Sequence, residues 1–198
     1  MAASEPAATR DKERTRRAIL VAAEKMFAER GSKASLTDIA TAAGVTQSGL
    51  RHHFHSREAL LFGVAENIVQ RYWTEIHDMV DLSENRPGKL MRAYVRALTG
   101  ADDLLSTLLD PAALSAALGH PKIFEDLFIR DAERWRAALA ADGLPMDVVL
   151  VIQHAAEGLA MARKSPYLTE ADLVSARTKL LAMTEDVRPF SDARVTGG

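Results

Sequence analysis

The stretch that decides the fold runs from Ser35 to Leu60 and reads SLTDIATAAGVTQSGLRHHFHSREAL. Ser35 is a residue type that caps helix N-termini, and Asp38 follows in the first turn, where its charge favours the helix dipole. Gly44 interrupts the helical pattern and supplies the positive φ that a sharp exit from a helix requires. A second short helix is predicted over residues 47–53. The stretch therefore predicts two short helices joined by a tight turn.

The two predicted helices divide their residues between an inner and an outer side. Ala40 falls where two steeply crossing helices need a small side chain, and Ile39, Val45 and Leu50 supply a small shared core. The second helix is left with a polar outer face. This pattern is typical of a helix-turn-helix, whose second helix enters the major groove of DNA.

The residue types on that polar face suit contact with a duplex. Glutamine can bond bidentately to adenine, and arginine to the O6 and N7 atoms of guanine. Serine and threonine hydroxyls can bond to bases or phosphates. The residues that fall on this polar face are Thr46, Gln47, Ser48, Arg51 and His52.

The rest of the chain also reads as helix, so the predicted fold class is all-α, a small N-terminal bundle followed by a larger one. The apolar spacing of the first helix starts at Thr15, and Gly31 ends it. The predicted domains are a disordered tail over 1–10, a helix-turn-helix domain over 11–55, a larger helical domain over 56–187, and a loose tail over 188–198. Within the larger domain we predict a long helix from Ser56 to about Val80, a loop over 81–88, and helices over 89–99, 103–109, 111–118, 122–141, 146–163 and 170–184.

Composition narrows the class of protein. The net charge is −2, but residues 1–60 carry ten Lys or Arg against seven Asp or Glu, so the basic part of the chain coincides with the predicted DNA reader. The sequence has no cysteine, which excludes disulfides and thiolate metal sites. No apolar run approaches the ~20 residues that span a bilayer. We expect a cytoplasmic protein without membrane association.

Beyond these local patterns, the run GSKASLTDIATAAGVTQSGLRHHFHSREALL resembles the DNA-binding signature of the TetR (tetracycline-repressor-like) family. The resemblance covers residues 14 to about 63, including AAEKMFAERG in the first helix. It implies a sequence-specific DNA-binding regulator, most often a repressor that a small ligand releases from its operator. Arg51 departs from the family pattern, which more often has a large apolar residue there, and Ser48-Gly49 replaces a commoner small-Thr pair. Both departures affect which operator sequence the protein would recognise, and not whether it binds DNA.

The resemblance also assigns contacts to individual residues. Ser35 and Thr37 fall where the family contacts phosphate, and Thr46, Gln47 and Ser48 fall on the base-reading start of the second helix. His53 and Arg57 fall on further phosphate contacts. The complete set of predicted DNA-binding residues is Ser35, Thr37, Thr46, Gln47, Ser48, Arg51, His52, His53 and Arg57.

In the larger domain the resemblance implies a homodimer formed through the last two helices, and a ligand pocket behind the long helix. The alternatives are that the last two helices bury their apolar residues only within the chain, that the aromatic residues are ordinary core, and that Gln153–Glu157 are polar contacts of a dimer. Aromatic and methionine side chains suit a roomy apolar cavity with few polar anchors. Further candidates for the lining of this pocket are Tyr72, Ile76, Met91 and Met161. The predicted ligand-binding residues are Trp73, His77, Tyr94, Phe124, Phe128, Trp135, Gln153, His154 and Glu157.

Enzymatic function has little support in the sequence. G-x-S-x-G, P-loop and H-E-x-x-H patterns are missing, and neighbouring His52 and His53 point apart on a helix, so no metal or cofactor is expected. The predicted partners are double-stranded DNA with a near-palindromic operator, a second copy of the chain, and a small, largely apolar effector. Two rivals remain open: a DNA-binding regulator without a small-molecule effector, and a helical enzyme or carrier that kept the reader fold.

Overall fold

The computed structural model describes residues 7–100, 121–163 and 165–185. The regular elements of this described part are all helical, which confirms the all-α fold class. Two compact units are present: the first contains residues up to Gln70 together with Pro121–Ile129, and the second contains Arg71–Gly100 and the described residues from Arg130 onward. The predicted helices over 103–109 and 111–118 and the predicted tail over 188–198 lie outside the described residues.

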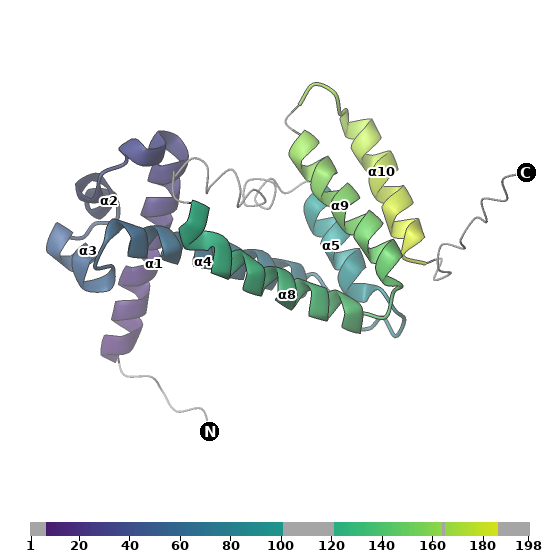
Figure 1. Cartoon of the computed structure of the whole chain (residues 1–198), viewed down its shortest axis with the longest axis horizontal. Coiled ribbons are helices and arrows are strands. Elements are labelled where there is room, and N and C mark those ends of the chain that lie inside the picture. The colour runs from purple at the N-terminus through teal and green to yellow at the C-terminus, as the bar shows by residue number, and fades with distance from the viewer. Residues whose placement is uncertain (1–6, 101–120, 164, 186–198) are drawn as a thin grey trace, which may run out of the picture. The chain divides into compact units, whose positions relative to one another are not determined.

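The first unit begins with a helix that is longer than predicted. Helix α1 (Ala7–Arg30) starts well before Thr15, so the prediction that the disordered tail extends to residue 10 is wrong for residues 7–10 (Figure 1). Residues 7–10 read AATR and carry no apolar periodicity, but alanine and arginine are good helix formers. Gly31 follows with φ +55° and ends the helix, as predicted.

The remaining elements of the first unit include helices close to their predicted bounds and two 3₁₀ turns that the sequence did not predict. They are the 3₁₀ turn η1 (Gly31–Lys33), α2 (Leu36–Ala42), α3 (Gln47–His53), the first part of α4 (Arg57–Asp78), η2 (Pro121–Phe124) and the start of α8 (Glu125–Ala141). Leu60, Leu61 and Val64 of α4 are fully buried. A Cβ atom on Gly63 would lie 2.7 Å from Phe54 Cε1 and 3.3 Å from Leu20 Cδ2. The start of α4 is therefore part of the core of the first unit, which extends past the predicted domain boundary at residue 56.

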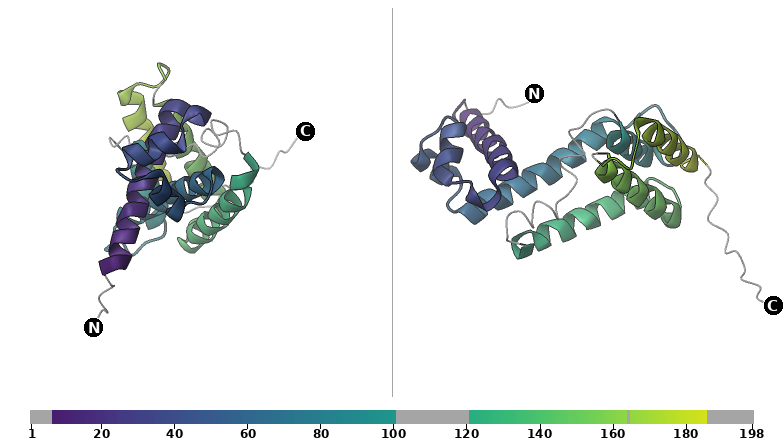
Figure 2. Two further views of the ribbon diagram at one scale, coloured as in Figure 1. Left: turned by 90° about the vertical axis from the view of Figure 1, so that its left-hand side faces the viewer. Right: turned by 90° about the horizontal axis from the view of Figure 1, so that it is seen from above.

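The second unit contains the later part of α4, α5 (Lys89–Thr99), the later part of α8, α9 (Met146–Ala162) and α10 (Glu170–Met183). Figure 2 shows α5, α9 and α10 packed side by side. Helix α10 starts at a capping box in which Thr169 and Asp172 each accept the other's backbone N–H, as their spacing predicts. Helix α5 is almost wholly buried, which makes it the centre of this unit.

A hydrogen-bond network fixes the loop before α5. The Arg92 guanidinium is 1% exposed and donates to Glu84 Oε2 through Nε at 2.6 Å and to the Pro87 carbonyl through Nη1 at 2.9 Å. The hydrogen bond to Arg92 lowers the pKa of Glu84. Asp142, from the end of α8, accepts the backbone N–H groups of Leu90 and Met91. The free N-terminal amides of α5 are thus capped by a side chain distant in sequence.

Candidate nucleic-acid interface and effector site

The turn between α2 and α3 is built from local sequence signals. Ser35 Oγ accepts the backbone N–H of Asp38 at 3.1 Å and caps α2. Gly44 has φ +69°, and the N–H of Val45 then donates to the Ala40 carbonyl at 3.0 Å. Ala40 is 2% exposed, as a close crossing of α2 and α3 requires. The predicted helix-turn-helix geometry is confirmed in each of these details.

Helix α3 presents its polar residues outward. Thr46 caps the helix, with its Oγ1 accepting the Gly49 N–H at 3.0 Å. Leu50 is fully buried and anchors the inner side. The outer side is exposed and carries, from the predicted set, Gln47, Ser48, Arg51 and His52. The arrangement leaves these side chains free to meet a duplex, and the predicted phosphate contacts Ser35 and Thr37 at the start of α2 are exposed as well.

His53 differs from its neighbours because it is half-buried at the end of α3. Its ring packs edge-on against His52 with 5.7 Å between centroids, and its Nδ1 is buried without a hydrogen-bond partner in the described part of the chain. Burial lowers the pKa of His53, and the nearby charges of His52, Lys12 and Arg16 lower it further. His53 is therefore neutral near pH 7, so a hydrogen bond rather than a full charge is what it offers a phosphate.

Arg57 has contacts that sequence reasoning missed. Its guanidinium donates to the carbonyl oxygens of Ala34 and, at 3.1 Å, of Ser32. It also lies 5.1 Å from the centroid of the Phe27 ring. The first residue of α4 is thereby tied to the segment that leads into α2. The guanidinium is therefore hydrogen-bonded within the protein, whereas the resemblance implied that it contacts a phosphate.

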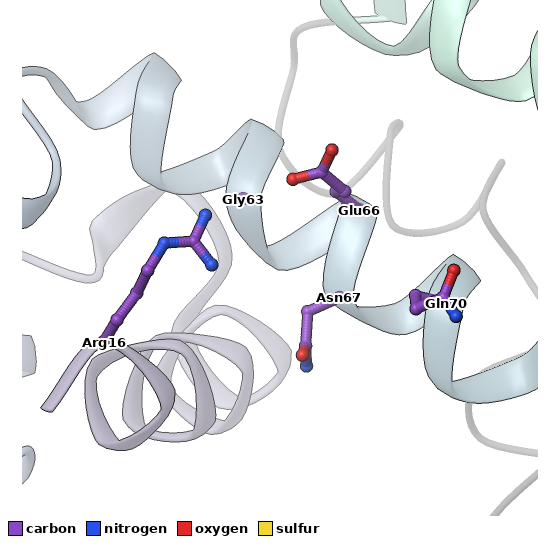
Figure 3. Close-up of a pocket in the computed structure, with 5 residues that line it drawn as sticks. All are labelled: Arg16, Gly63, Glu66, Asn67 and Gln70. Atoms are coloured by element: carbon purple, nitrogen blue, oxygen red, sulfur yellow. The ribbon is translucent and has the colours of Figure 1, made fainter. Parts of the chain in front are cut away.

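A polar cavity lies between α1 and α4 (Figure 3). Its volume is about 300 Å³, and it is lined by Arg16, Gly63, Glu66, Asn67 and Gln70. Charged and amide side chains line most of it, whereas sites for apolar ligands are lined mainly by hydrophobic and aromatic groups. This cavity is therefore a poor candidate for an apolar effector.

The second unit brings most of the predicted ligand-binding aromatics together. Trp135 is the centre of this aromatic cluster, with ring centroids 4.7 Å from Trp73, 5.4 Å from Tyr94, 5.6 Å from Tyr72 and 5.9 Å from His77. The rings come from α4, α5 and α8, which are far apart in sequence. We call this group, Tyr72, Trp73, His77, Tyr94 and Trp135, the aromatic cluster.

Hydrogen bonds connect the aromatic cluster to α9. Tyr94 Oη donates to Glu157 Oε1 at 2.6 Å, and Gln153 Nε2 donates to the same oxygen at 3.1 Å. Gln153 and Glu157 therefore share a helix face, as their spacing predicts. Burial raises the pKa of Tyr94 well above its ordinary value, so its hydroxyl stays protonated and acts as the donor.

Three polar atoms near the aromatic cluster are buried without a hydrogen-bond partner in the described part of the chain. They are Tyr72 Oη, Trp135 Nε1 and Asp131 Oδ1. Leaving a buried polar atom unpaired costs about 1–3 kcal/mol. Asp131 was not among the predicted site residues, although it stands four residues before Trp135 on the same helix face. Three such atoms in one place mark the strongest candidate for a ligand contact.

Three predicted ligand-binding residues lie elsewhere. His154 is exposed on α9, where its Nδ1 lies 2.9 Å from the Leu150 carbonyl. Phe124 and Phe128 pair with each other in the first unit, with ring centroids 5.9 Å apart. His154 lies about 100° around the helix from Gln153, so its side chain points away from the direction that Gln153 and Glu157 share.

The described residues form neither a metal site nor a membrane-spanning helix. Within them, no three acidic or histidine side chains gather closely enough to hold a metal ion. Their helices also include none with the length and apolar character needed to cross a membrane.

A capped two-helix turn with an outward polar helix, followed by a larger helical unit, defines the class of helix-turn-helix regulators. Comparisons with known proteins agree. A family model for bacterial regulatory proteins of the tetR family matches residues 19–64, and one for the tetracyclin repressor-like C-terminal domain matches residues 88–185. The chain belongs to the TetR family. Its members are transcriptional regulators, which confirms the prediction that this chain is not an enzyme.

Curated relatives match only part of their length. The transcriptional repressor KstR2 of Mycobacterium tuberculosis is 35% identical over 78 residues, which cover 39% of this chain and 39% of the relative. KstR2 of Mycolicibacterium smegmatis is 33% identical over 93 residues, or 46% of this chain and 42% of the relative.

Solved structures share the fold over nearly the whole chain. A transcriptional regulator from Rhodococcus sp. Rha1 superposes with a TM-score of 0.68 and 21% identity, covering 88% of this chain and 99% of that one. A TetR transcription regulator from Haloarcula marismortui gives a TM-score of 0.66 and 17% identity, with 87% and 97% covered. At this identity the likeness concerns the fold alone.

Proposed function

We propose that this chain is a homodimeric, cytoplasmic transcriptional repressor that binds a near-palindromic DNA operator and leaves it when a small, largely apolar effector binds. The observation that carries the proposal is the exposed outer side of α3, capped by Thr46 and set by the Gly44 turn. Gln47 is the residue we assign to base reading, together with Ser48 and Arg51. The KstR2 relatives are repressors by name, which supports repression over activation.

Dimerisation through α9 and α10 is supported by their exposed apolar residues. Leu150, Val151 and Met161 of α9 and Val174 of α10 are 42–62% exposed in the single chain. A Cβ on Gly158 would meet no atom within 4 Å, so a partner helix has room to approach closely. A monomer rarely leaves such a face uncovered. A two-fold dimer would also place two copies of α3 about one helical turn of DNA, ~34–36 Å, apart.

The aromatic cluster is the proposed effector site. It combines aromatic walls with unpaired polar atoms, which is the usual composition of a small-molecule site. A structural neighbour, EbrR, is a multidrug binding protein solved with imidazole, with a TM-score of 0.59 and 19% identity over 89% of this chain and 92% of that one. Helix α4 runs from Arg57 beside α2 to Trp73 and His77 in the cluster, so an effector that shifts α4 would act on the reader. Such coupling is typically ~1–3 kcal/mol.

Selection from a random duplex DNA library tests the proposal. The purified full chain should enrich an inverted repeat with one fixed spacing between half-sites, because two copies of α3 read DNA around one symmetry axis. Gln47→Ala should change the enriched bases and keep the spacing. Asn85→Ala, an amide removed from an exposed loop of the second unit, should enrich the wild-type sequence.

Salt-sensitive binding without sequence enrichment would contradict the repressor proposal, provided that protein unfolded, extracted and refolded to remove any copurified effector behaves the same way. Enrichment of a single half-site would contradict the dimer while leaving α3 as the reader. An unchanged base preference in Gln47→Ala would remove Gln47 from base reading.

A further inference from the structure

The aromatic cluster offers a ligand a particular combination of hydrogen bonds. Tyr72 and Trp135 are 9% and 6% exposed, and Trp135 Nε1 has no partner among the described residues. Tyr72 Oη makes no well-aligned hydrogen bond there, although the Tyr94 hydroxyl lies close enough to affect its pKa. The Oδ1 atom of half-buried Asp131 is also unpartnered there. All three belong to the second unit and lie on α4 and α8. The cluster therefore holds more unpaired polar groups than a sealed aromatic core would keep.

The three groups need different partners. An indole N–H only donates, a carboxylate oxygen only accepts, and a phenol hydroxyl does both. Burial raises the pKa of Tyr72, so its hydroxyl keeps its proton and can donate. A ligand group that satisfies the cluster must accept from the indole or phenol and also donate to the carboxylate. A hydroxyl group does both, whereas a ketone only accepts and an ammonium group only donates.

Charge narrows the choice further. Glu157 and Asp131 both face Tyr72, and each disfavours a negative charge there. Arg134 is also near, with its guanidinium 3.5 Å from the centroid of the Trp73 ring. Burial raises the pKa of Asp131, and the charge of Arg134 opposes that rise. A buried anion beside two carboxyl groups would be repelled and would lose its hydration without a matched partner. A neutral hydroxyl avoids both penalties.

We propose that the aromatic cluster binds a neutral, apolar ring compound through a hydroxyl group, which accepts from Tyr72 Oη or Trp135 Nε1 and donates to Asp131 Oδ1. This rests on the proposed function, since it names the chemical class of its effector. The apolar rings of Tyr72, Tyr94 and Trp135 supply the surface against which the ring compound packs.

The chain contains its own reporter for this site. Its only two tryptophans are Trp73 and Trp135, whose rings are 4.7 Å apart in the cluster. Any change in intrinsic tryptophan fluorescence therefore comes from the cluster. No label and no DNA are needed to follow binding.

Adamantane derivatives make suitable probes because they share one apolar cage and do not absorb where tryptophan does. Titration of the full chain with adamantan-1-ol should give a saturable fluorescence change. Adamantane-1-carboxylate should bind at least about tenfold more weakly, because two carboxyl groups repel it. 1-Aminoadamantane should bind at least about tenfold more weakly too, because its ammonium group cannot accept from Tyr72 Oη or Trp135 Nε1 and lies near the charge of Arg134. The three probes differ only in one functional group on the same ring system, so any difference in their affinity comes from that group.

Two variants test the named contacts. Tyr72→Phe should weaken adamantan-1-ol about fivefold by removing one hydrogen bond, while Tyr167→Phe, a matched change on a 92% exposed tyrosine, should have no effect. Asp131→Ala should weaken the alcohol and tighten the carboxylate, because it removes both the acceptor and the repelling charge. Thermal unfolding of each variant checks that it folds, and the opposite responses of the two probes could not arise from misfolding.

The proposal is overturned if the carboxylate or the amine binds as tightly as the alcohol, if Tyr72→Phe leaves alcohol binding unchanged, or if no probe gives a saturable change. These outcomes are distinct from failure of the repressor proposal. An enriched operator without alcohol binding would remove only the effector class. Alcohol binding without an enriched operator would leave a ligand-binding helical protein and remove the DNA reader.

Discussion

At the scale of single residues, side chains in the DNA reader can serve the fold and contact DNA at once. Ser35 Oγ and Thr46 Oγ1 each accept a backbone N–H at a helix start. A hydroxyl that accepts through a lone pair still has its own proton to donate. Capping therefore leaves both residues able to bond to a phosphate oxygen, as the resemblance implies. Arg57 differs, because its guanidinium already donates to the backbone carbonyls of Ala34 and Ser32.

Arg57 is expected to act mainly by positioning α4. Replacing it with alanine leaves the buried Ala34 carbonyl without its donor, which should cost about 1–3 kcal/mol of stability. DNA binding should weaken for every sequence, because α2 loses its tie to α4. The dependence of affinity on salt concentration should stay unchanged, since the guanidinium is held by protein carbonyls.

Thermal unfolding and DNA titrations at several salt concentrations check this prediction. A salt slope that falls by roughly one unit in Arg57→Ala would instead identify a lost phosphate contact. Arg57→Lys is the informative companion, because it keeps the charge and loses the planar pair of donors.

His53 makes the stability of the reader depend on pH. Its pKa is lowered in the folded chain from an ordinary value of 6.5, so the unfolded chain binds a proton first as the pH falls. Stability contributed by neutral His53 is complete above pH 6.5 and decreases as the pH drops toward the folded pKa. The melting temperature should thus fall more between about pH 7.5 and about pH 5.5 in the wild type than in His53→Asn. Equal falls in both proteins would show that His53 does not titrate differently on folding.

At the scale of elements, α4 packs against Phe54 at Gly63, where a larger side chain has little room. Gly63→Ala would place a methyl group 2.7 Å from the Phe54 ring, and the cost of such overpacking is about 1–3 kcal/mol. We expect a matching fall in stability in denaturant unfolding. Phe54→Leu alone should also destabilise, but in the double variant it should relieve part of the Gly63→Ala penalty. Additive effects would mean that the two residues do not touch.

At the scale of the whole molecule, the proposed dimer rests on the exposed apolar face of α9. Leu150→Glu should raise the dimer dissociation constant at least about tenfold, because a charge would be buried against the partner. Leu82→Glu is the matched control: Leu82 is 81% exposed in the loop before α5 and should leave the dimer intact. Sedimentation analysis over a range of concentrations separates the two. A wild-type chain that sediments as a monomer at all concentrations would remove the proposed interface.

The DNA reader could be predicted from the sequence because its determinants are local. Caps at Ser35 and Thr46 act within one helical turn, and the positive φ of Gly44 needs no distant partner. The ends of α3 and α5 accordingly match their predicted residues. The start of α1 did not, because residues 7–10 show no apolar periodicity.

The proposed effector site, in contrast, depended on the tertiary structure. Trp135 meets Tyr72 and Tyr94 only because α4, α5 and α8 pack together across long stretches of sequence. That packing left His154 exposed on α9 and Asp131 Oδ1 unpaired beside the aromatic cluster. It also turned Arg57 toward the Ala34 carbonyl. The sequence by itself determined the helices and the reader, since those signals act between near neighbours; the ligand-facing chemistry was decided by tertiary packing, because only packing determines which buried polar groups find a partner.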